Sequence, residues 1–278
     1  MNISAKTKIC MIIGDPVDHS LSPAMHNAAY QHCGIDGNFV YLGTNVKIEH
    51  LKNAIDAARV LDIRGLTCTI PHKVKVLEYI DEVDPIAQQI GAANTIVNTN
   101  GVLKGFNTDW LGVVAPLEQI TNLKGKSVSV IGAGGAARAV VFGAKERGAV
   151  VTIYNRTLKN AQKLAHEFDC KAMMLSESGR MRESDIIINA TSVGMGSLVG
   201  KSPIPASVIS SKHIVLDIVY TPYETMLLRI AKEKGARIIH GIDMLLYQGT
   251  AQFKLYTGLD APVEVMRKAL FQHSGIHV

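Results

Sequence analysis

The sequence predicts an α/β protein built from two α/β domains with mainly parallel sheets. Two observations predict this class. Short apolar, strand-like runs alternate with helix-like segments along nearly all of the 278 residues, as in consecutive βαβ units. A glycine-rich segment near the middle, residues 132–135, follows one such run and opens a helical pattern, which separates an earlier group of strands from a later one.

The expected strands are residues 9–13, 39–42, 65–70, 94–97, 128–131, 150–154, 185–189, 214–219 and 237–239. Helical patterns lie between most of them, and the tail from residue 241 is helical in pattern. These strands are too many for one small sheet, so the group before about residue 108 is expected to form a separate domain. We find no repeat or long linker, so the two domains are expected to enclose a cleft.

Composition limits the classes of function. Hydrophobic residues make up 47% and charged residues 19%, which favours a globular chain over a disordered one. The net charge of +5 is spread along the chain, so no nucleic-acid footprint is indicated. No apolar run approaches the roughly 18 residues of a membrane span. The four cysteines form no C-x-x-C pair, so we expect no metal site, no disulfide framework and a cytoplasmic protein.

The first candidate site is the segment SLSPAMHN. Ser22 is expected to be the N-cap of a helix whose first residue is Pro23. A capped helix alone does not explain the second serine, Ser20. Two hydroxyls beside a helix N-terminus would bind a carboxylate.

A lysine follows the strand at residues 65–70. The segment TIPHK ends this strand at a proline and places Lys73 in the first turn of a helix expected over residues 74–80. The helix dipole and burial would lower the pKa of a lysine there, which suits proton transfer near neutral pH. The alternative is that the Lys73 side chain is simply exposed to solvent, like that of Lys75. The sequence leaves the role of His72 undecided in the same way.

Two further segments carry polar candidates. GAANT places the amide of Asn94 at the start of a strand, and GFNTDW places the carboxylate of Asp109 where the chain enters the second domain. Taken alone, Asp109 is more simply the N-cap of the helix that follows.

The glycine segment SVSVIGAGGAAR fits the dinucleotide-binding pattern G-x-G-x-x-G/A. Gly132, Gly134 and Ala137 occupy its three small positions, and the helix that follows ends on Gly148. A Rossmann-type domain is therefore expected, with a diphosphate at the helix N-terminus. An ordinary turn between a strand and a helix is the alternative.

The end of the next strand separates the two nicotinamide cofactors. NAD-binding units carry Asp or Glu about 20 residues past the glycines, to bind the ribose hydroxyl. This chain has Asn155, Arg156 and Thr157 there, which would bind a 2′-phosphate, so we infer NADP(H). A solvated charge at Arg156 is the alternative.

Together, SLSPAMHN, TIPHK, GAANT and GFNTDW resemble, in order and spacing, the shikimate dehydrogenase family, which includes quinate/shikimate dehydrogenases. NATSVGM, DIVYTPYET and GIDMLLYQGTAQF, later in the chain, are similar to its remaining motifs. The resemblance implies reversible NADPH-dependent reduction of 3-dehydroshikimate to shikimate, a step of chorismate and aromatic amino acid biosynthesis. It also implies that residues 242–278 join residues 1–108 in a substrate-binding catalytic domain, and that residues 109–241 form the NADP-binding Rossmann domain, with the active-site cleft between them.

The resemblance also implies roles for individual residues. On the substrate side these are Ser20 and Ser22 for the carboxylate, Lys73 and Asp109 as the catalytic pair, Thr69, Asn94 and Gln248 for the ring hydroxyls, and Tyr220 at the pocket. On the cofactor side they are Gly132, Ala133, Gly134, Gly135 and Ala136 for the diphosphate, Asn155, Arg156 and Thr157 for the adenosine phosphate, and Thr191, Val219 and Gly241 around the nicotinamide.

Some positions depart from the family pattern. Many members have Asn in place of Thr67, and NADP-specific members often carry a second Arg where this chain has Leu158, Lys159 and Asn160. A quinate/shikimate dehydrogenase that prefers NAD therefore stays open. So does a non-catalytic NADP-binding sensor, although a sensor has no need of Lys73 and Asp109. The motifs leave open whether the protein is a monomer or a homodimer.

Overall fold

The computed structural model describes residues 3–274. The chain divides into two compact units, Met1–Thr108 with Gln248–Val278, and Asp109–Tyr247. The change back to the first unit falls inside helix α8 (Gly241–Thr257), whereas the sequence analysis placed it near the start of that helix. Within the described part of the chain, no helix has the length and apolar character needed to cross a membrane.

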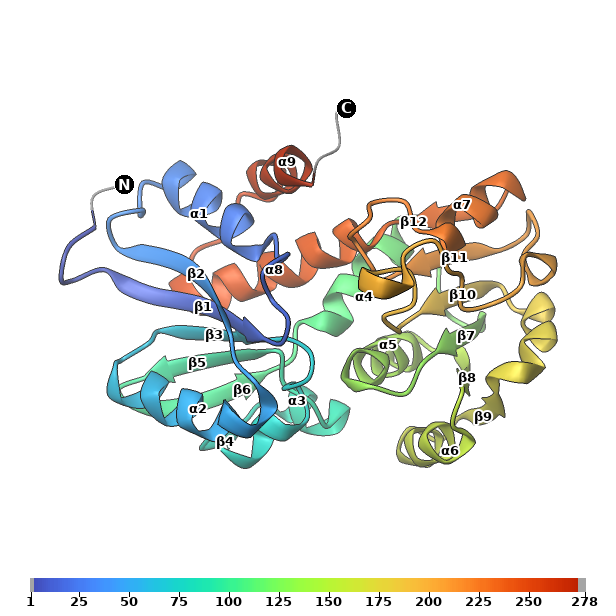
Figure 1. The fold of residues 1–278 in the computed structure, drawn as a ribbon, viewed down its shortest axis with the longest axis horizontal. Helices are drawn as coiled ribbons and strands as arrows, with labels where there is room; N and C mark the ends of the chain where they lie inside the picture. The colour runs from blue at the N-terminus through green and yellow to red at the C-terminus, as the bar shows by residue number, and fades with distance from the viewer. Residues whose placement is uncertain (1–2, 275–278) are drawn as a thin grey trace. The chain divides into compact units, whose positions relative to one another are not determined.

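The first unit is built on a six-stranded sheet in the order β2-β1-β3-β5-β6-β4 (Figure 1). β1 is parallel to β2 and β3, and β4 is parallel to β6, but β5 is antiparallel to both β3 and β6. The strands are β1 (Lys8–Gly14), β2 (Phe39–Asn45), β3 (Gly65–Cys68), β4 (Glu82–Val83), β5 (Thr95–Thr99) and β6 (Val102–Phe106). The helices are α1 (Ser22–His32), α2 (Leu51–Val60), α3 (Pro85–Ile90) and α9 (Val263–His273), with 3-10 helices at Ile48–His50 and Lys75–Glu78.

Helix α8 packs closely on this sheet because of a glycine. A Cβ at Gly65, the first residue of β3, would lie 2.4 Å from ring atoms of Tyr256 on α8. The glycine therefore lets the tyrosine ring lie directly on the strand. Arg64 fixes the same contact, since its Nε donates to the backbone oxygen of Tyr256 at 3.0 Å.

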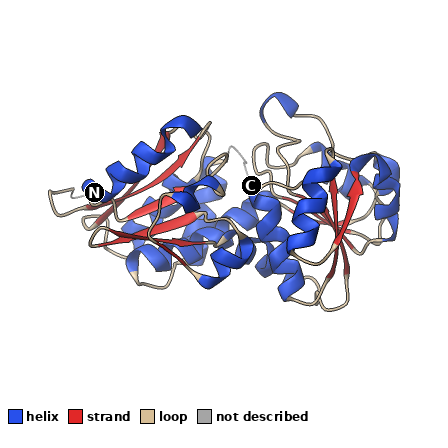
Figure 2. Cartoon of the chain, turned by 90° about the horizontal axis from the view of Figure 1, so that it is seen from below, coloured by secondary structure: helices blue, strands red, loops and turns tan. Residues whose placement is uncertain are grey.

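The second unit is built on a sheet in the order β12-β11-β10-β7-β8-β9, and every strand pair in it is parallel. Its strands are β7 (Ser127–Ile131), β8 (Val150–Asn155), β9 (Lys171–Met174), β10 (Ile186–Asn189), β11 (Ile214–Asp217) and β12 (Arg237–Ile239). Its helices are α4 (Asp109–Glu118), α5 (Gly135–Glu146), α6 (Leu158–Glu167) and α7 (Met226–Glu233), with 3-10 helices at Leu175–Glu183, Gly196–Leu198 and Ala206–Val208. In each unit, helices lie along the faces of the sheet (Figure 2).

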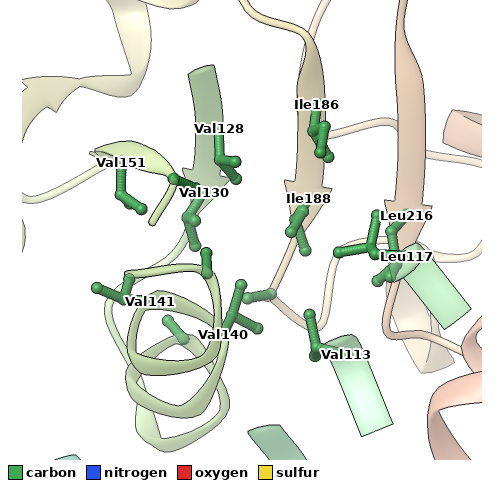
Figure 3. Close-up of a cluster of buried hydrophobic side chains, with 14 of the residues drawn as sticks. Val113, Leu117, Val128, Val130, Val140, Val141, Val151, Ile186, Ile188 and Leu216 are labelled. Carbon is green, nitrogen blue, oxygen red and sulfur yellow. The ribbon is translucent and has the colours of Figure 1, made fainter. Parts of the chain in front are cut away.

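Both faces of the second sheet are buried, which explains its apolar strands. Ile186 and Ile188 of β10 pack with α4 and α5 on one face, as Figure 3 shows. Ile187, between them, belongs to a separate buried cluster with α7. Alternate side chains of a strand point to opposite faces, so each face needs its own apolar set.

The structure corrects two local predictions. Residues 74–80 do not form an α-helix, and only a 3-10 helix at Lys75–Glu78 is present. Ser22 is not the N-cap of α1 but its first residue, while Leu21 is the N-cap and makes no side-chain capping bond. The strands β4, β6 and β9 were not predicted. The α/β class with mainly parallel sheets is confirmed.

Candidate active site

The glycine turn between β7 and α5 makes a close approach to the strand beside it. Gly132 has a φ of +116°, and a Cβ there would lie 2.9 Å from the backbone oxygen of Ala190 and 3.0 Å from Cγ2 of Thr191. Only glycine fits both the backbone angle and the space. The turn therefore packs directly against the segment that follows β10.

The remainder of the turn is open. Outside the glycine and its two chain neighbours, no atom lies within 4 Å of a Cβ built at Gly134, and α5 starts at the next residue, Gly135, without a side-chain cap. The N–H groups of the first helical turn are thus served by no capping side chain, which suits an anion. Ala133 and Ala136 add only methyl groups to this turn, and Ala137 is fully buried in the core below it.

The other expected cofactor residues lie at the same edge of the sheet. They follow the carboxyl ends of neighbouring parallel strands, with Asn155, Arg156 and Thr157 at the end of β8, Thr191 after β10 and Val219 after β11. β8 and β10 flank β7, so the glycine turn stands where the strand order reverses, the usual ligand position in open α/β sheets. Gly241 joins this edge, because a Cβ there would lie 2.4 Å from the backbone oxygen of Val219.

The end of β8 carries a cation and no carboxylate. Arg156 is exposed, and the side-chain Nδ2 of Asn155 donates to the backbone oxygen of Thr157 at 2.9 Å. This bond shapes the turn into α6, whose N-cap is Thr157. The backbone also ties this turn to the glycines, since the N–H of Gly132 donates to the backbone oxygen of Tyr154 at 2.8 Å.

A buried carboxylate orders the loops after β10 and β11. Asp217 accepts hydrogen bonds from Asn189 Nδ2 at 2.9 Å, from the N–H of Val219 at 3.0 Å and from the hydroxyl of Thr225 at 2.7 Å. Burial raises the pKa of Asp217 to about 6, although these three donors oppose the shift. Asn189 Oδ1 in turn accepts from the hydroxyl of Thr191 at 2.6 Å.

The loop that carries Lys73 is held at both ends. The N–H of Thr69 donates to Ile13 at 3.0 Å, and the N–H of Ala93 donates to the backbone oxygen of Lys73 at 2.8 Å. Between these points, His72 Nε2 donates to the backbone oxygen of Val46 at 2.7 Å. His72 is fully buried, which lowers its pKa. Lys73 lies in a turn ahead of a four-residue 3-10 helix, so the helix-dipole argument made from the sequence does not apply.

The two serines meet at the start of α1. The backbone N–H of Ser22 donates to Oγ of Ser20 at 3.3 Å, so Ser20 forms the local turn that leads into the helix. Ser22 is 1% exposed, while Ser20 is half-buried. The pair thus lies at a helix N-terminus, where the sequence analysis expected a carboxylate site.

Asn94 is hydrogen-bonded to two other segments of the candidate site. Its Oδ1 accepts from the backbone N–H of Thr108 at 2.8 Å, and its Nδ2 donates to Oγ1 of Thr108 at 2.9 Å and to Oε1 of Gln248 at 3.4 Å. The structure therefore brings Asn94 and Gln248 together. Asp109, directly after Thr108, is the first residue of α4 and is almost fully buried, and Tyr220 is half-buried after β11.

Comparison with known proteins identifies the family. Residues 12–96 match the shikimate dehydrogenase substrate binding domain, residues 116–220 match shikimate / quinate 5-dehydrogenase, and residues 241–271 match the shikimate 5'-dehydrogenase C-terminal domain. The chain belongs to the shikimate dehydrogenase family. The resemblance inferred from the sequence motifs is thereby confirmed.

Individual relatives match over nearly the whole chain. The shikimate dehydrogenase (NADP(+)) of Dehalococcoides mccartyi (strain CBDB1) is 45% identical over 267 residues, 92% of this chain and 93% of that protein. A crystal structure of a shikimate dehydrogenase in complex with NADP+ has a TM-score of 0.91 at 41% identity, covering 97% of this chain and 96% of the other. The structure of the Thermus thermophilus enzyme with NADP(H) and shikimate has a TM-score of 0.89 at 38% identity, with coverage of 96% and 100%.

Sequence reasoning missed the residues that hold the family's expected site residues in place. Asn189, Asp217 and Thr225 lie within the motifs NATSVGM and DIVYTPYET, but only Thr191, Val219 and Tyr220 of those motifs were given roles. Polar residues at the ends of otherwise apolar strands were the available signal, since a buried polar group needs partners. Gln252, on α8, gave no such signal.

Proposed function

We propose that this protein is a shikimate dehydrogenase, which reversibly reduces 3-dehydroshikimate to shikimate with NADPH in aromatic amino acid biosynthesis. The observation that carries the proposal is the family match along the whole chain. Relatives named shikimate dehydrogenase (NADP(+)) cover 92% or more of it. The geometry of two of the expected segments supports the proposal. The glycine turn stands at the carboxyl edge of the second sheet, and Lys73 lies on an anchored loop.

The second unit fits NADP(H). The open space at Gly134 and the uncapped N-terminus of α5 suit a diphosphate, and exposed Arg156 with Asn155 and Thr157 suits a 2′-phosphate. NADPH, when bound, supplies the hydride that reduces the substrate carbonyl. Thr191, Val219 and Gly241 are the candidates for the nicotinamide end, since Asn189 and Asp217 order the segments that carry Thr191 and Val219.

The first unit supplies most of the substrate contacts. Ser20 and Ser22, at the N-terminus of α1, would hold the carboxylate with hydroxyl and helix N–H donors. Thr69, Asn94 and Gln248 would bind the ring hydroxyls. Hydrogen bonds of Thr69, His72 and the Lys73 backbone oxygen hold the loop from which the Lys73 side chain extends.

Lys73 and Asp109 are the proposed catalytic residues. Negative charge develops on the carbonyl oxygen as the carbonyl is reduced, and the ammonium of Lys73 donates a proton to it. Asp109, with its carboxylate at the start of α4, is the proposed partner that holds this ammonium in place. In the oxidation of shikimate, neutral Lys73 accepts the proton from the hydroxyl.

Initial rates of reduced-nicotinamide formation test the proposal. Shikimate and quinate are each paired with NADP+ and NAD+, for the wild type, Lys73→Ala and Lys75→Ala. Lys75 is the matched control, because it is exposed, two residues away and paired with Glu78 at 2.6 Å. We expect turnover with shikimate and NADP+ that falls about 10²- to 10⁴-fold in Lys73→Ala only. A preference for quinate or NAD+ would contradict the assignment of substrate or cofactor, and NADPH binding without turnover would indicate a sensor.

A further inference from the structure

A chain of buried polar side chains crosses the first unit and ends at Asn94. Its members come from β2, β3, β5, the residue before β5, and α8, and each is at most 5% exposed: Tyr41, Tyr256, Thr67, Gln252, Thr95 and Asn94. Only Asn94 among them has a proposed role in substrate binding. Each hydroxyl in such a hydrogen-bond chain carries a single proton. Which partner one hydroxyl donates to therefore decides which group donates and which accepts at the next bond, and this order is the direction of the chain.

A backbone group sets the direction at Asn94. The N–H of Thr108 can only donate, so the Asn94 atom 2.8 Å from it is the amide oxygen Oδ1 and the amide cannot be flipped. The hydroxyl of Thr95 lies 2.8 Å from the same oxygen and must donate to it. Any other arrangement would set two lone pairs against each other at 2.8 Å.

The direction then passes through Gln252. Because the hydroxyl proton of Thr95 is donated to Asn94, the Thr95 oxygen is the acceptor of its other bond, and Gln252 Nε2 donates to it at 2.9 Å. This turns Gln252 Oε1 toward Thr67, whose hydroxyl donates to it at 3.2 Å. Gln252 is fully buried on α8 and joins the two strands β3 and β5 through its two amide atoms.

Thr67 closes the chain at its other end. With its proton directed to Gln252, its oxygen accepts from the hydroxyls of Tyr41 at 2.5 Å and Tyr256 at 3.0 Å. One donated and two accepted bonds use the full capacity of a hydroxyl. Thr67, at a position where many family members have Asn, therefore serves as the anchor of Gln252 and has no capacity left for a ligand.

We propose that Gln252 is a positioning residue for substrate recognition: by donating to the hydroxyl oxygen of Thr95, it keeps the Thr95 proton directed at Oδ1 of Asn94, whose orientation the N–H of Thr108 sets. This inference rests on the proposed function, in which Asn94 and Gln248 bind a ring hydroxyl. Oδ1 of Asn94 is occupied by Thr95 and Thr108, so Asn94 presents its Nδ2. The long bond of 3.4 Å from Nδ2 to Gln248 Oε1 is the one that a ring hydroxyl replaces, accepting from Asn94 and donating to Gln248.

The variants Gln252→Glu and Gln252→Met test this direction. A protonated glutamic acid donates to Thr95 and accepts from Thr67, as glutamine does, whereas a carboxylate can only accept and draws the Thr95 proton away from Asn94. Burial raises the pKa of such a glutamate, while the buried imidazole of His26, which faces residue 252, opposes the rise. We expect the ratio of the KM for shikimate in Gln252→Glu to that in the wild type to rise with pH as the glutamate ionises, to about tenfold at pH 9.

Gln252→Met separates direction from packing. Methionine fills the space but donates nothing to Thr95, so the Thr95 hydroxyl can turn from Asn94 toward Oγ1 of Thr108, 3.4 Å away. The ratio of the KM for shikimate in this variant to that in the wild type should therefore stay raised about tenfold at every pH, with the KM for NADP+ unchanged. Tyr30→Phe is the matched control, since it removes a fully buried hydroxyl outside this hydrogen-bond chain and should leave both KM values unchanged. Lower thermal stability in the Gln252 variants with wild-type KM values at all pH would overturn the proposal.

A double-mutant cycle supplies a second, independent measurement. Thr95→Val breaks the chain at its centre and should raise the KM for shikimate about as much as Gln252→Met does. If the hydrogen-bond chain acts as one unit, the KM for shikimate of the double variant is no higher than that of either single variant. Additive effects of the two substitutions would overturn the proposal. Wild-type turnover is measured first: its absence would refute the proposed function, while turnover with KM values insensitive to these changes would refute only the positioning role.

Discussion

Replacing either of two glycines of the same turn by alanine should have different effects: Gly132→Ala should lower stability, and Gly134→Ala should weaken cofactor binding. At Gly132 an added Cβ meets the backbone oxygen of Ala190 at 2.9 Å and the backbone carbon of that residue at 3.2 Å. Ala190 cannot easily move, because its N–H donates to Ile131 at 2.8 Å. The φ of +116° adds backbone strain of about 1–3 kcal/mol for any other residue.

Gly132→Ala should therefore destabilise the second unit by about 3 kcal/mol, a fall in Tm of roughly 6–12 °C for a unit of this size. Gly134→Ala is the matched change. Its backbone is ordinary extended chain, with φ −91° and ψ −172°, and its Cβ would meet no protein atom within 4 Å. The Tm of Gly134→Ala should stay within about 3 °C of the wild type, because the one cost of the change is that alanine is a poorer N-cap than glycine.

Cofactor binding separates the two variants further. In the proposed site the diphosphate occupies the open space beside Gly134, so Gly134→Ala should weaken NADPH binding at least tenfold in calorimetry despite its normal stability. Wild-type NADPH affinity in Gly134→Ala would refute the placement of the diphosphate. A wild-type Tm in Gly132→Ala would refute the reasoning about its contact with Ala190.

Two further predictions concern charge. Arg156→Ala should raise the KM for NADP+ about 10- to 100-fold and leave the KM for NAD+ within about twofold, since a charge-assisted bond to a 2′-phosphate is lost; equal changes for both cofactors would contradict the assignment. Asp217 has a raised pKa in the folded state, so its stabilising contribution is complete below the unfolded value near 4 and is lost as pH rises through about 6. Relative to Asp217→Asn, the wild type should lose about 3 kcal/mol of stability between pH 4 and 7. Thermal unfolding across this range measures it, and parallel Tm curves for the two proteins would contradict it.

The strands of the second sheet were predictable because both of its faces are buried. β10 needs apolar residues at Ile186, Ile187 and Ile188, and such continuous runs are visible in the sequence. β9 is an edge strand and β4 has only two residues, so neither carries a comparable pattern. β6 contains a lysine and a glycine, which hide its alternation.

The predicted helix at residues 74–80 failed for a reason outside that segment. An α-helix there would need the backbone oxygen of Lys73 to accept from Leu77. That oxygen already accepts from Ala93, and Leu77 donates to Val74 instead, one residue closer, as in a 3-10 turn. Local propensity favoured a helix, but a contact with a residue far along the chain removed its first hydrogen bond.

Some features of the candidate site could also be predicted from the local sequence, whereas others depend on distant contacts. The glycine turn was readable because its demands are made on the backbone, and only a few residue types meet a positive φ or a close approach. The role of Gln252 could not be predicted from the sequence, because it depends on partners such as Thr67, which lies 185 residues away in the chain. The direction of that chain begins with the N–H of Thr108, a group that nearly every residue possesses and that no sequence pattern can mark.

Thr67 has a different role in the structure from the one that its sequence position indicates. In the sequence alone, Thr in place of the family's Asn indicates a substrate contact that is shortened or lost. In the structure its hydroxyl meets Tyr41, Tyr256 and Gln252, each suited to its one proton and two lone pairs. An Asn here would bring two donor protons to the position where Gln252 needs one, so Thr67→Asn in this chain should disturb Gln252 instead of restoring a contact. A KM for shikimate raised in Thr67→Asn, and not raised further when Gln252→Met is added, would be the signature of that coupling.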